Sequence, residues 1–269
     1  MMRWSDVSPL ASAFWRMALA APLLSAWAFS VRKQDCAAGR RNDITRAVVL
    51  AGLFFVGDIG FWHLSLHHTT VSNATLLSNL APVFIALWLW VACRARFARA
   101  FLAGLAIALS GAVLLVTPNA MDAAHASSSK LMGDGFGLAS ALFYAAYQLV
   151  VKDARSQYST ARLMAWSTTI SALGLLPFAL LSEGAFFPAQ ISGWLPLLGL
   201  ALIAQIGGQT VIAYASAHMP ASVSSVGLLI QPLTAAIAAW IIFSEAIGLV
   251  QAGGAVLLVF GIYLSKRAG

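Results

Sequence analysis

Residues 71–93, VSNATLLSNLAPVFIALWLWVAC, and residues 221–243, ASVSSVGLLIQPLTAAIAAWIIF, align without gaps when the sequence is shifted by 150 residues. Within these stretches the shift pairs Pro82 with Pro232 and Trp90 with Trp240. Outside them it pairs Gly57 with Gly207, His68 with His218, Gly104 with Gly254 and Gly111 with Gly261. Because these residue types are uncommon in an apolar background, the register indicates an internal repeat. Both copies consist of membrane-length apolar segments, a pattern typical of secondary transporters.

The composition places the chain in a lipid bilayer. Of the 269 residues, 60% are apolar and only 9% are charged, so a single globule could not bury the apolar surface. Each apolar stretch is close to the ~20 residues that cross the hydrocarbon layer as a helix. The sequence predicts an all-α polytopic membrane protein with nine spans, at about residues 10–31, 47–66, 71–93, 98–117, 134–151, 162–181, 193–216, 222–243 and 248–265.

Basic residues predict the orientation of these spans. They concentrate in the loops after the first, third, fifth and ninth spans, the last of which holds Lys266 and Arg267. These loops share one side of the membrane, which the positive-inside rule makes the cytoplasm. Topology thereby explains the net charge of +7, and a nucleic-acid partner loses its support. We expect a multi-pass protein of the inner (plasma) membrane whose C-terminus is cytoplasmic.

The repeat predicts one helix more than the nine spans. Under the 150-residue shift, the counterpart of the span at 134–151 would precede Met1, so the first helix is expected to be missing. Five helices per half give a ten-helix fold, and an odd number per half inverts the halves relative to the membrane. The predicted domains are residues 1–117 for the first repeat, 118–133 for an external linker and 134–269 for the second repeat.

Several motifs resemble those of a known family. They are Asp58-Ile-Gly-Phe-Trp-His-Leu-Ser-Leu, Val71-Ser-Asn-Ala-Thr-Leu-Leu-Ser-Asn-Leu-Ala-Pro, Gln231-Pro-Leu, Glu245, Gln251-Ala-Gly-Gly-Ala and Gly261-Ile-Tyr-Leu. Their order and spacing resemble the EamA-type transporters of the drug/metabolite transporter superfamily, over essentially the whole chain. The resemblance implies a ten-helix inverted-repeat fold around a central cavity, with Gln231 a candidate for its lining. It also implies export of amino acids or other small metabolites.

Asp58 is the main candidate for chemistry inside a span. A charge at the centre of a bilayer costs roughly 2.5–3.5 kcal/mol, so Asp58 should face a wet cavity, pair with a cation or be protonated. Two interpretations follow: a site for a proton or a cationic substrate, or a structural ion pair with Arg16. His63 is a titrating partner for Asp58 in the first interpretation and a packing residue in the second.

The helix predicted at 71–93 has a polar stripe that includes Thr75, Asn79 and Pro82 at spacings of three and four. Small polar residues in such a stripe can serve helix packing. Asn79 is the better ligand candidate, because a carboxamide both donates and accepts hydrogen bonds. Pro82 and Pro232 lack a backbone donor at equivalent points, which predicts kinks or hinges, with carbonyl coordination of substrate as the alternative.

Two further polar stripes occur in the second half of the chain. One contains Gln205, Gln209 and Ser216, and the other contains Ser140, Tyr144, Tyr147 and Gln148. Both are expected to point into the bundle. Tyr144 and Tyr147 could form an aromatic-walled pocket with Trp62, or they could serve core packing.

Enzymatic, channel and purely structural functions are the alternatives to transport. The sequence has no His-Glu-x-x-His motif, and an aspartyl membrane protease would need a second mid-span carboxylate beside Asp58. We expect a non-enzymatic secondary transporter, without metal or cofactor, that exports small metabolites and above all amino acids by alternating access. A channel or structural protein stays an alternative. Proton coupling and the choice between monomer and homodimer stay open.

Overall fold

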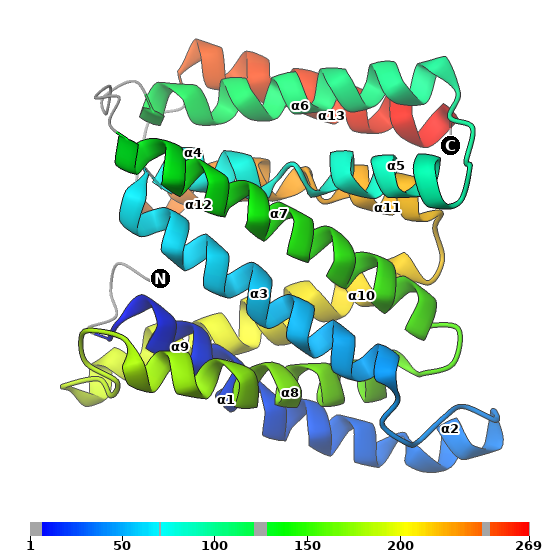
Figure 1. The fold of residues 1–269 in the computed structure, drawn as a ribbon, viewed down its shortest axis with the longest axis vertical. Coiled ribbons are helices and arrows are strands. Elements are labelled where there is room, and N and C mark those ends of the chain that lie inside the picture. Colours follow the sequence, from blue (N-terminus) through cyan, green and yellow to red (C-terminus); the bar gives the residue numbers. More distant parts are fainter. Residues whose placement is uncertain (1–6, 70, 121–127, 244–247, 269) are drawn as a thin grey trace. The chain divides into compact units, whose positions relative to one another are not determined.

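A computed structural model describes residues 7–69, 71–120, 128–243 and 248–268, and every regular element within these ranges is helical (Figure 1). Five of the described segments are long and apolar enough to cross a membrane: Arg46–His68, Asn73–Ala92, Thr160–Leu181, Ile191–Ser216 and Leu249–Arg267. The predicted all-α class is confirmed, whereas nine spans and a ten-helix fold stay predictions. Residues 121–127 of the predicted linker and Glu245 lie outside the described residues.

The helices form two compact units, which we describe one at a time. Unit 1 comprises Met1–His63 and Ala146–His218, and unit 2 comprises Leu64–Ala145 and Met219–Gly269. Helices α3 (Arg46–His68) and α7 (Ser128–Ala154) each contribute residues to both units. Since α6 (Arg99–Ala120) ends at Ala120 and α7 begins at Ser128, both edges of the predicted linker are helical.

In unit 1, α1 (Pro9–Ser30) packs against α8 (Thr160–Leu181) in the opposite direction (Figure 1). Each helix begins after a serine N-cap, Ser8 or Ser159, whose side chain accepts a backbone N–H of the first turn. The two ends of the pair are tied separately. Ser8 Oγ lies 2.8 Å from Ser182 Oγ, and Arg162 donates to the Ala28 carbonyl over 3.4 Å. The short helix α2 (Arg32–Ala37) follows α1.

The helical segment that ends unit 1 changes its winding along its length. The 3₁₀ turn η3 (Ile191–Gly193) and helix α9 (Trp194–Gly199) lead into a π-helical stretch, η4 (Leu200–Gln209), and then into α10 (Thr210–Ser216). A π-helix bonds each N–H to the carbonyl five residues back, and such stretches are rare and frequent at functional sites. The sequence predicted a single span here and gave no sign of the π-helical winding.

In unit 2, α6 and α13 (Leu249–Ala268) lie side by side and cross through glycines (Figure 1). A Cβ added to Gly104 would lie 2.8 Å from the Gly261 carbonyl oxygen, and one added to Gly111 would lie 2.6 Å from that of Gly254. Residue numbers rise along α6 from Gly104 to Gly111, while those of the contacted residues on α13 fall from Gly261 to Gly254, so the two helices are antiparallel. The 150-residue shift exchanges the two glycine pairs, which gives this crossing a local two-fold symmetry.

Two predicted spans of unit 2 are broken at equivalent points. The first divides into α4 (Val71–Ser78) and α5 (Ala81–Ala92), and the second into α11 (Ala221–Gly227) and α12 (Ile230–Phe243). Each break lies just before a proline, Pro82 or Pro232, which cannot donate to the carbonyl four residues earlier. At each break the backbone forms tighter hydrogen bonds between residues three apart, such as the bond from Leu80 N–H to the Leu77 carbonyl at 3.1 Å. Both helices are thus interrupted at the two prolines, while kinks and hinge motion stay predictions.

Candidate functional site

A cation lies inside unit 1 and is held by a glutamine. Arg16, in the middle of α1, donates from Nε over 3.2 Å and from a terminal nitrogen over 3.0 Å to Oε1 of Gln205. Gln205 Nε2 donates to Thr168 Oγ1 over 3.1 Å, and Gln205 is only 1% exposed. The Gln205 amide therefore connects α1, η4 and α8. The sequence predicted Gln205 as a site residue but offered Arg16 only as a partner for Asp58.

The π-helical stretch ends on a second predicted site residue, Gln209. Its side-chain oxygen is buried and has no hydrogen-bond donor within the described part of the chain. A buried polar atom left in this state costs about 1–3 kcal/mol. A ligand N–H or an ordered water that donates to Gln209 would remove this cost.

Helix α3 carries three of the predicted residues in unit 1. Asp58 and Trp62 are partly buried, and His63 is 3% exposed. His63 Nδ1 lies 2.7 Å from the Ile59 carbonyl, and its ring meets that of Trp62 edge-on with centroids 5.1 Å apart. The bond to Ile59 makes Nδ1 the protonated nitrogen of neutral His63, because a carbonyl can only accept.

Tyr147 belongs to the same interior. It is 2% exposed, and its ring lies 4.8 Å from that of Phe55 between centroids. The Arg16 guanidinium lies 5.8 Å from the centroid of Phe55, a distance typical of cation–π contacts. Phe55 thus contacts both Tyr147, a predicted site residue, and Arg16, which the sequence analysis did not place in the site.

The remaining predicted residues belong to unit 2. Gln231 Nε2 donates to the Tyr144 hydroxyl over 3.4 Å, which brings two predicted residues from α12 and α7 together. Asn79 Nδ2 donates to the Thr75 carbonyl over 2.8 Å, so one N–H donor of this side-chain amide is occupied at the break between α4 and α5. The predicted proximity of Asp58 and His63 to Asn79 involves both units and stays a prediction.

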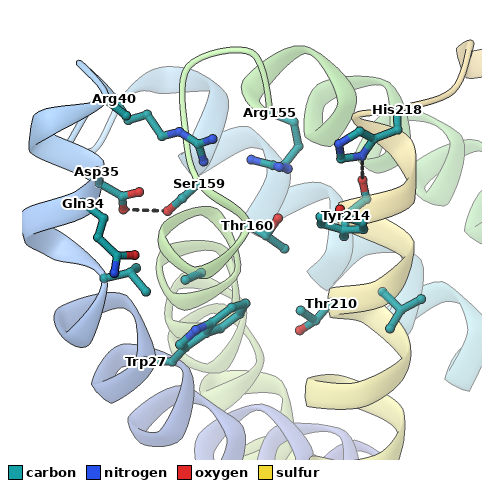
Figure 2. A pocket seen from close by; sticks show the side chains of 14 residues that line it. Trp27, Gln34, Asp35, Arg40, Arg155, Ser159, Thr160, Thr210, Tyr214 and His218 are labelled. Atoms are coloured by element: carbon teal, nitrogen blue, oxygen red, sulfur yellow. Dashed lines mark hydrogen bonds between the residues drawn. The ribbon is translucent and has the colours of Figure 1, made fainter.

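A pocket of about 760 Å³ opens at one end of unit 1 (Figure 2). One wall is the end of α1 with α2, and the opposite wall is α10. The turn between α7 and α8 joins these walls. Trp27 and Asp35 line the first wall, Arg155 and Ser159 belong to the turn, and Thr210 and Tyr214 line the wall formed by α10. Arg40 and Arg155 both line this pocket, and they belong to the basic loops after the first and fifth predicted spans, which the sequence analysis used for membrane topology alone.

Asp35 is the buried acid of the pocket wall. It is 5% exposed, accepts a hydrogen bond from Ser159 Oγ at 2.7 Å, and lies 3.9 Å from a guanidinium nitrogen of Arg162. Ser159 also caps α8, so this acid fixes the end of α2 against the start of α8. Its negative charge is therefore engaged inside the wall.

The basic side chains of the pocket are less fully engaged. Arg155 donates to the Tyr158 carbonyl, and its Nε is buried without an acceptor among the described residues. Burial lowers the pKa of the Arg155 guanidinium, and the nearby charge of Arg40 lowers it further, against the opposing effect of Asp35. Arginine stays charged at neutral pH even so. Within the described ranges, no three His, Cys, Asp or Glu side chains are grouped as metal ligands would be.

Known proteins similar to this chain are transporters. An uncharacterized transporter of Archaeoglobus fulgidus is 28% identical over 264 residues, which cover 97% of this chain and 88% of the relative. The pseudopaline exporter of Pseudomonas aeruginosa is 25% identical over 203 residues, 75% of this chain and 68% of the relative. A probable terminal-alkyne amino-acid exporter of Streptantibioticus cattleyicolor is 24% identical over 200 residues, 74% of this chain and 65% of the relative.

The fold is shared with a solved protein. A crystal structure matches 99% of this chain and 91% of its own chain, with a TM-score of 0.79 and 18% sequence identity. The EamA-like transporter family matches residues 1–117 and again residues 131–267. The resemblance found in the sequence motifs is thereby confirmed over nearly the whole length, and the chain belongs to the EamA-like transporter family.

Proposed function

We propose that this membrane transporter exports small metabolites, and amino acids first among them, by alternating access through a central cavity between inverted repeats. The family match to both halves of the chain carries the proposal. Two of the similar proteins have names that describe exporters, one of pseudopaline and one, as a probable assignment, of a terminal-alkyne amino acid. Their identities of 24–25% support the substrate class only by analogy.

The inverted repeat has support inside unit 2. The crossing of α6 with α13 pairs Gly104 with Gly261 and Gly111 with Gly254, and the repeat shift exchanges these pairs. Two antiparallel helices related in this way have a two-fold axis across their length. In a membrane-spanning protein such an axis lies in the plane of the bilayer, as inverted repeats require. The breaks before Pro82 and Pro232 follow the same repeat and are the proposed hinges.

The polar interior of unit 1 supports a zwitterionic substrate. Gln209 offers a buried acceptor that lacks a donor among the described residues, which suits an ammonium group. Arg16 places a guanidinium within the same unit, and guanidinium groups pair with carboxylates. Asp58 and His63 are the proposed groups for proton coupling. The predicted domains, and Trp62, Asn79, Tyr144, Tyr147, Gln205 and Gln231 as further cavity residues, stay part of the proposal.

Lys266 and Arg267 in the last turn of α13 are the basis of the proposed cytoplasmic C-terminus in the inner membrane, and basic residues in unit 1 follow the same rule. In unit 1, the end that joins α2, the α7–α8 turn and α10 carries Arg32, Lys33, Arg40, Arg41, Lys152 and Arg155. At the opposite end, where Trp15 donates to the Phe186 carbonyl, Glu183 is the charged residue among those described. This asymmetry agrees with the positive-inside rule.

Counterflow in proteoliposomes tests the proposal. Vesicles preloaded with one unlabelled amino acid at a time should accumulate the matching radiolabelled amino acid if it is a substrate, and protein-free vesicles should not. Gln209→Leu should weaken this exchange because it removes the buried acceptor. Ile203→Leu, at an exposed and apolar position of the same π-helical stretch, is the matched control and should leave exchange unchanged. Failure of every amino acid, with exchange of another metabolite class, would contradict the substrate assignment.

A further inference from the structure

The pocket of unit 1 combines two cations with an acid that is already engaged. Arg155 uses one donor on the Tyr158 carbonyl, and the side chain of Arg40 has no hydrogen-bond or ion-pair partner among the described residues. Asp35 accepts from Ser159 and lies beside Arg162 in the wall. The charge of Arg40 lies close enough to Arg155 to lower the pKa of the Arg155 guanidinium. The pocket therefore has an excess of positive charge directed at its interior (Figure 2).

The same pocket has an apolar and aromatic side. Trp27 on α1 and Tyr214 on α10 stand on opposite walls, and they are 40% and 58% exposed (Figure 2). Val31 and Val211 also line it. Tryptophan and tyrosine favour the interface between hydrocarbon and lipid headgroups. A ligand with an anionic head and an apolar body would match both parts of the pocket.

We propose that this pocket binds the phosphate of an anionic bilayer lipid, with Arg40 and Arg155 at the headgroup and Trp27 and Tyr214 beside the start of the acyl chains. Basic pockets between membrane helices on the cytoplasmic side are suited to anionic headgroups. Guanidinium groups bind phosphate oxygens through two parallel N–H donors. A free phosphate ion would share the contacts with arginine but gain nothing from the aromatic walls, so the lipid is the occupant that uses the whole pocket.

The test of this lipid site does not need a transport substrate, so its failure and the failure of the proposed transport function can be told apart. Purified protein in detergent is titrated with phosphatidylglycerol, with phosphatidylcholine and with inorganic phosphate, and its unfolding temperature is recorded. Phosphatidylglycerol at saturating concentration should raise this temperature by about 5 °C more than phosphatidylcholine does. Inorganic phosphate should have little effect. An equal shift with inorganic phosphate would overturn the lipid assignment and indicate a general oxyanion site.

Matched variants separate the pocket from the general surface charge. R40Q/R155Q and R32Q/K33Q each remove two positive charges from the same end of unit 1, but only the first pair lines the pocket. Native mass spectrometry should find phosphatidylglycerol binding to R40Q/R155Q weakened on the order of 30-fold, at about 1 kcal/mol for each basic residue. R32Q/K33Q should bind like the wild type. Equal binding by both double variants would overturn the proposal.

Arg155 also supports the turn before α8, so its loss could reduce folding. The single variant Arg40→Gln avoids this difficulty, because the Arg40 side chain is exposed and makes no hydrogen bond within the described residues, while its backbone N–H, which donates to the Asp35 carbonyl over 2.9 Å, is kept in the variant. It should still bind phosphatidylglycerol several-fold less tightly than Arg32→Gln does. No difference between these two single variants would also refute the assignment.

Discussion

Asp58 lies near the middle of α3, where bilayer insertion of a charged carboxylate costs roughly 2.5–3.5 kcal/mol. If it carries the coupled proton, Asp58→Asn should abolish uphill transport driven by a pH gradient while substrate counterflow persists. The amide keeps hydrogen bonding but cannot titrate. The same change at Asp153, an exposed residue at the end of α7, is the control. Unchanged pH-driven transport in Asp58→Asn would assign Asp58 to structure.

Gln205 accepts two bonds from Arg16 and donates one to Thr168 while almost wholly buried. Gln205→Leu removes these contacts and leaves a guanidinium in the interior of unit 1 without this acceptor. We expect the free energy of unfolding in detergent to fall by about 2 kcal/mol. Denaturant titration would measure the change. Gln190→Leu, in an exposed loop, should alter stability by less than about 0.5 kcal/mol. Equal stability of the two variants would contradict this account of Gln205.

At the scale of elements, the crossing of α6 and α13 depends on the absence of side chains. A Cβ on Gly254 would lie 2.8 Å from the Gly111 carbonyl oxygen, whereas nothing lies within 4 Å of a Cβ on Gly253. Gly254→Ala should therefore destabilise the protein by about 1–3 kcal/mol through overpacking. Gly253→Ala, one residue away on the same helix, should be neutral or stabilise it by up to about 1 kcal/mol. Thermal unfolding of the two variants in one detergent checks the difference in sign.

The helices themselves were largely predictable from the sequence. A membrane segment must satisfy its own backbone groups, so long apolar stretches become helices, as at Thr160–Leu181. The interruptions before Pro82 and Pro232 follow from missing backbone donors. The π-helical stretch Leu200–Gln209 was not predictable, because over ten residues an apolar pattern does not separate its winding from that of an α-helix.

For the whole molecule, native cysteines can report the orientation in the membrane. Cys36 belongs to unit 1 and Cys93 to unit 2, and both are exposed. The positive-inside rule puts both on the cytoplasmic side. A membrane-impermeant maleimide should therefore label them in inside-out vesicles of the inner membrane. It should not label them in intact cells in which only the outer membrane has been permeabilised. Cys36→Ser and Cys93→Ser assign the signal to each residue. Labelling of either cysteine from outside would contradict the predicted topology.

The candidate site was less predictable than the helices, for a physical reason. Spacing rules identify residues that share a face of one helix, which is how Gln205 and Gln209 were found. They do not identify contacts between helices far apart in the chain, such as Arg16 with Gln205 across 189 residues. The same limit hid the pocket at Arg155, where loop arginines looked like topology markers until α10 was placed beside them.

The glycine crossing in unit 2 links the evolutionary histories of the two halves of the chain. Each of these glycine contacts takes one glycine from each half, Gly104 with Gly261 and Gly111 with Gly254. After a gene duplication, a larger residue in either copy would strike the backbone of the other copy. Drift is therefore restrained at these positions by the sister half, while neighbours such as Gly253, with open space around them, are free to diverge.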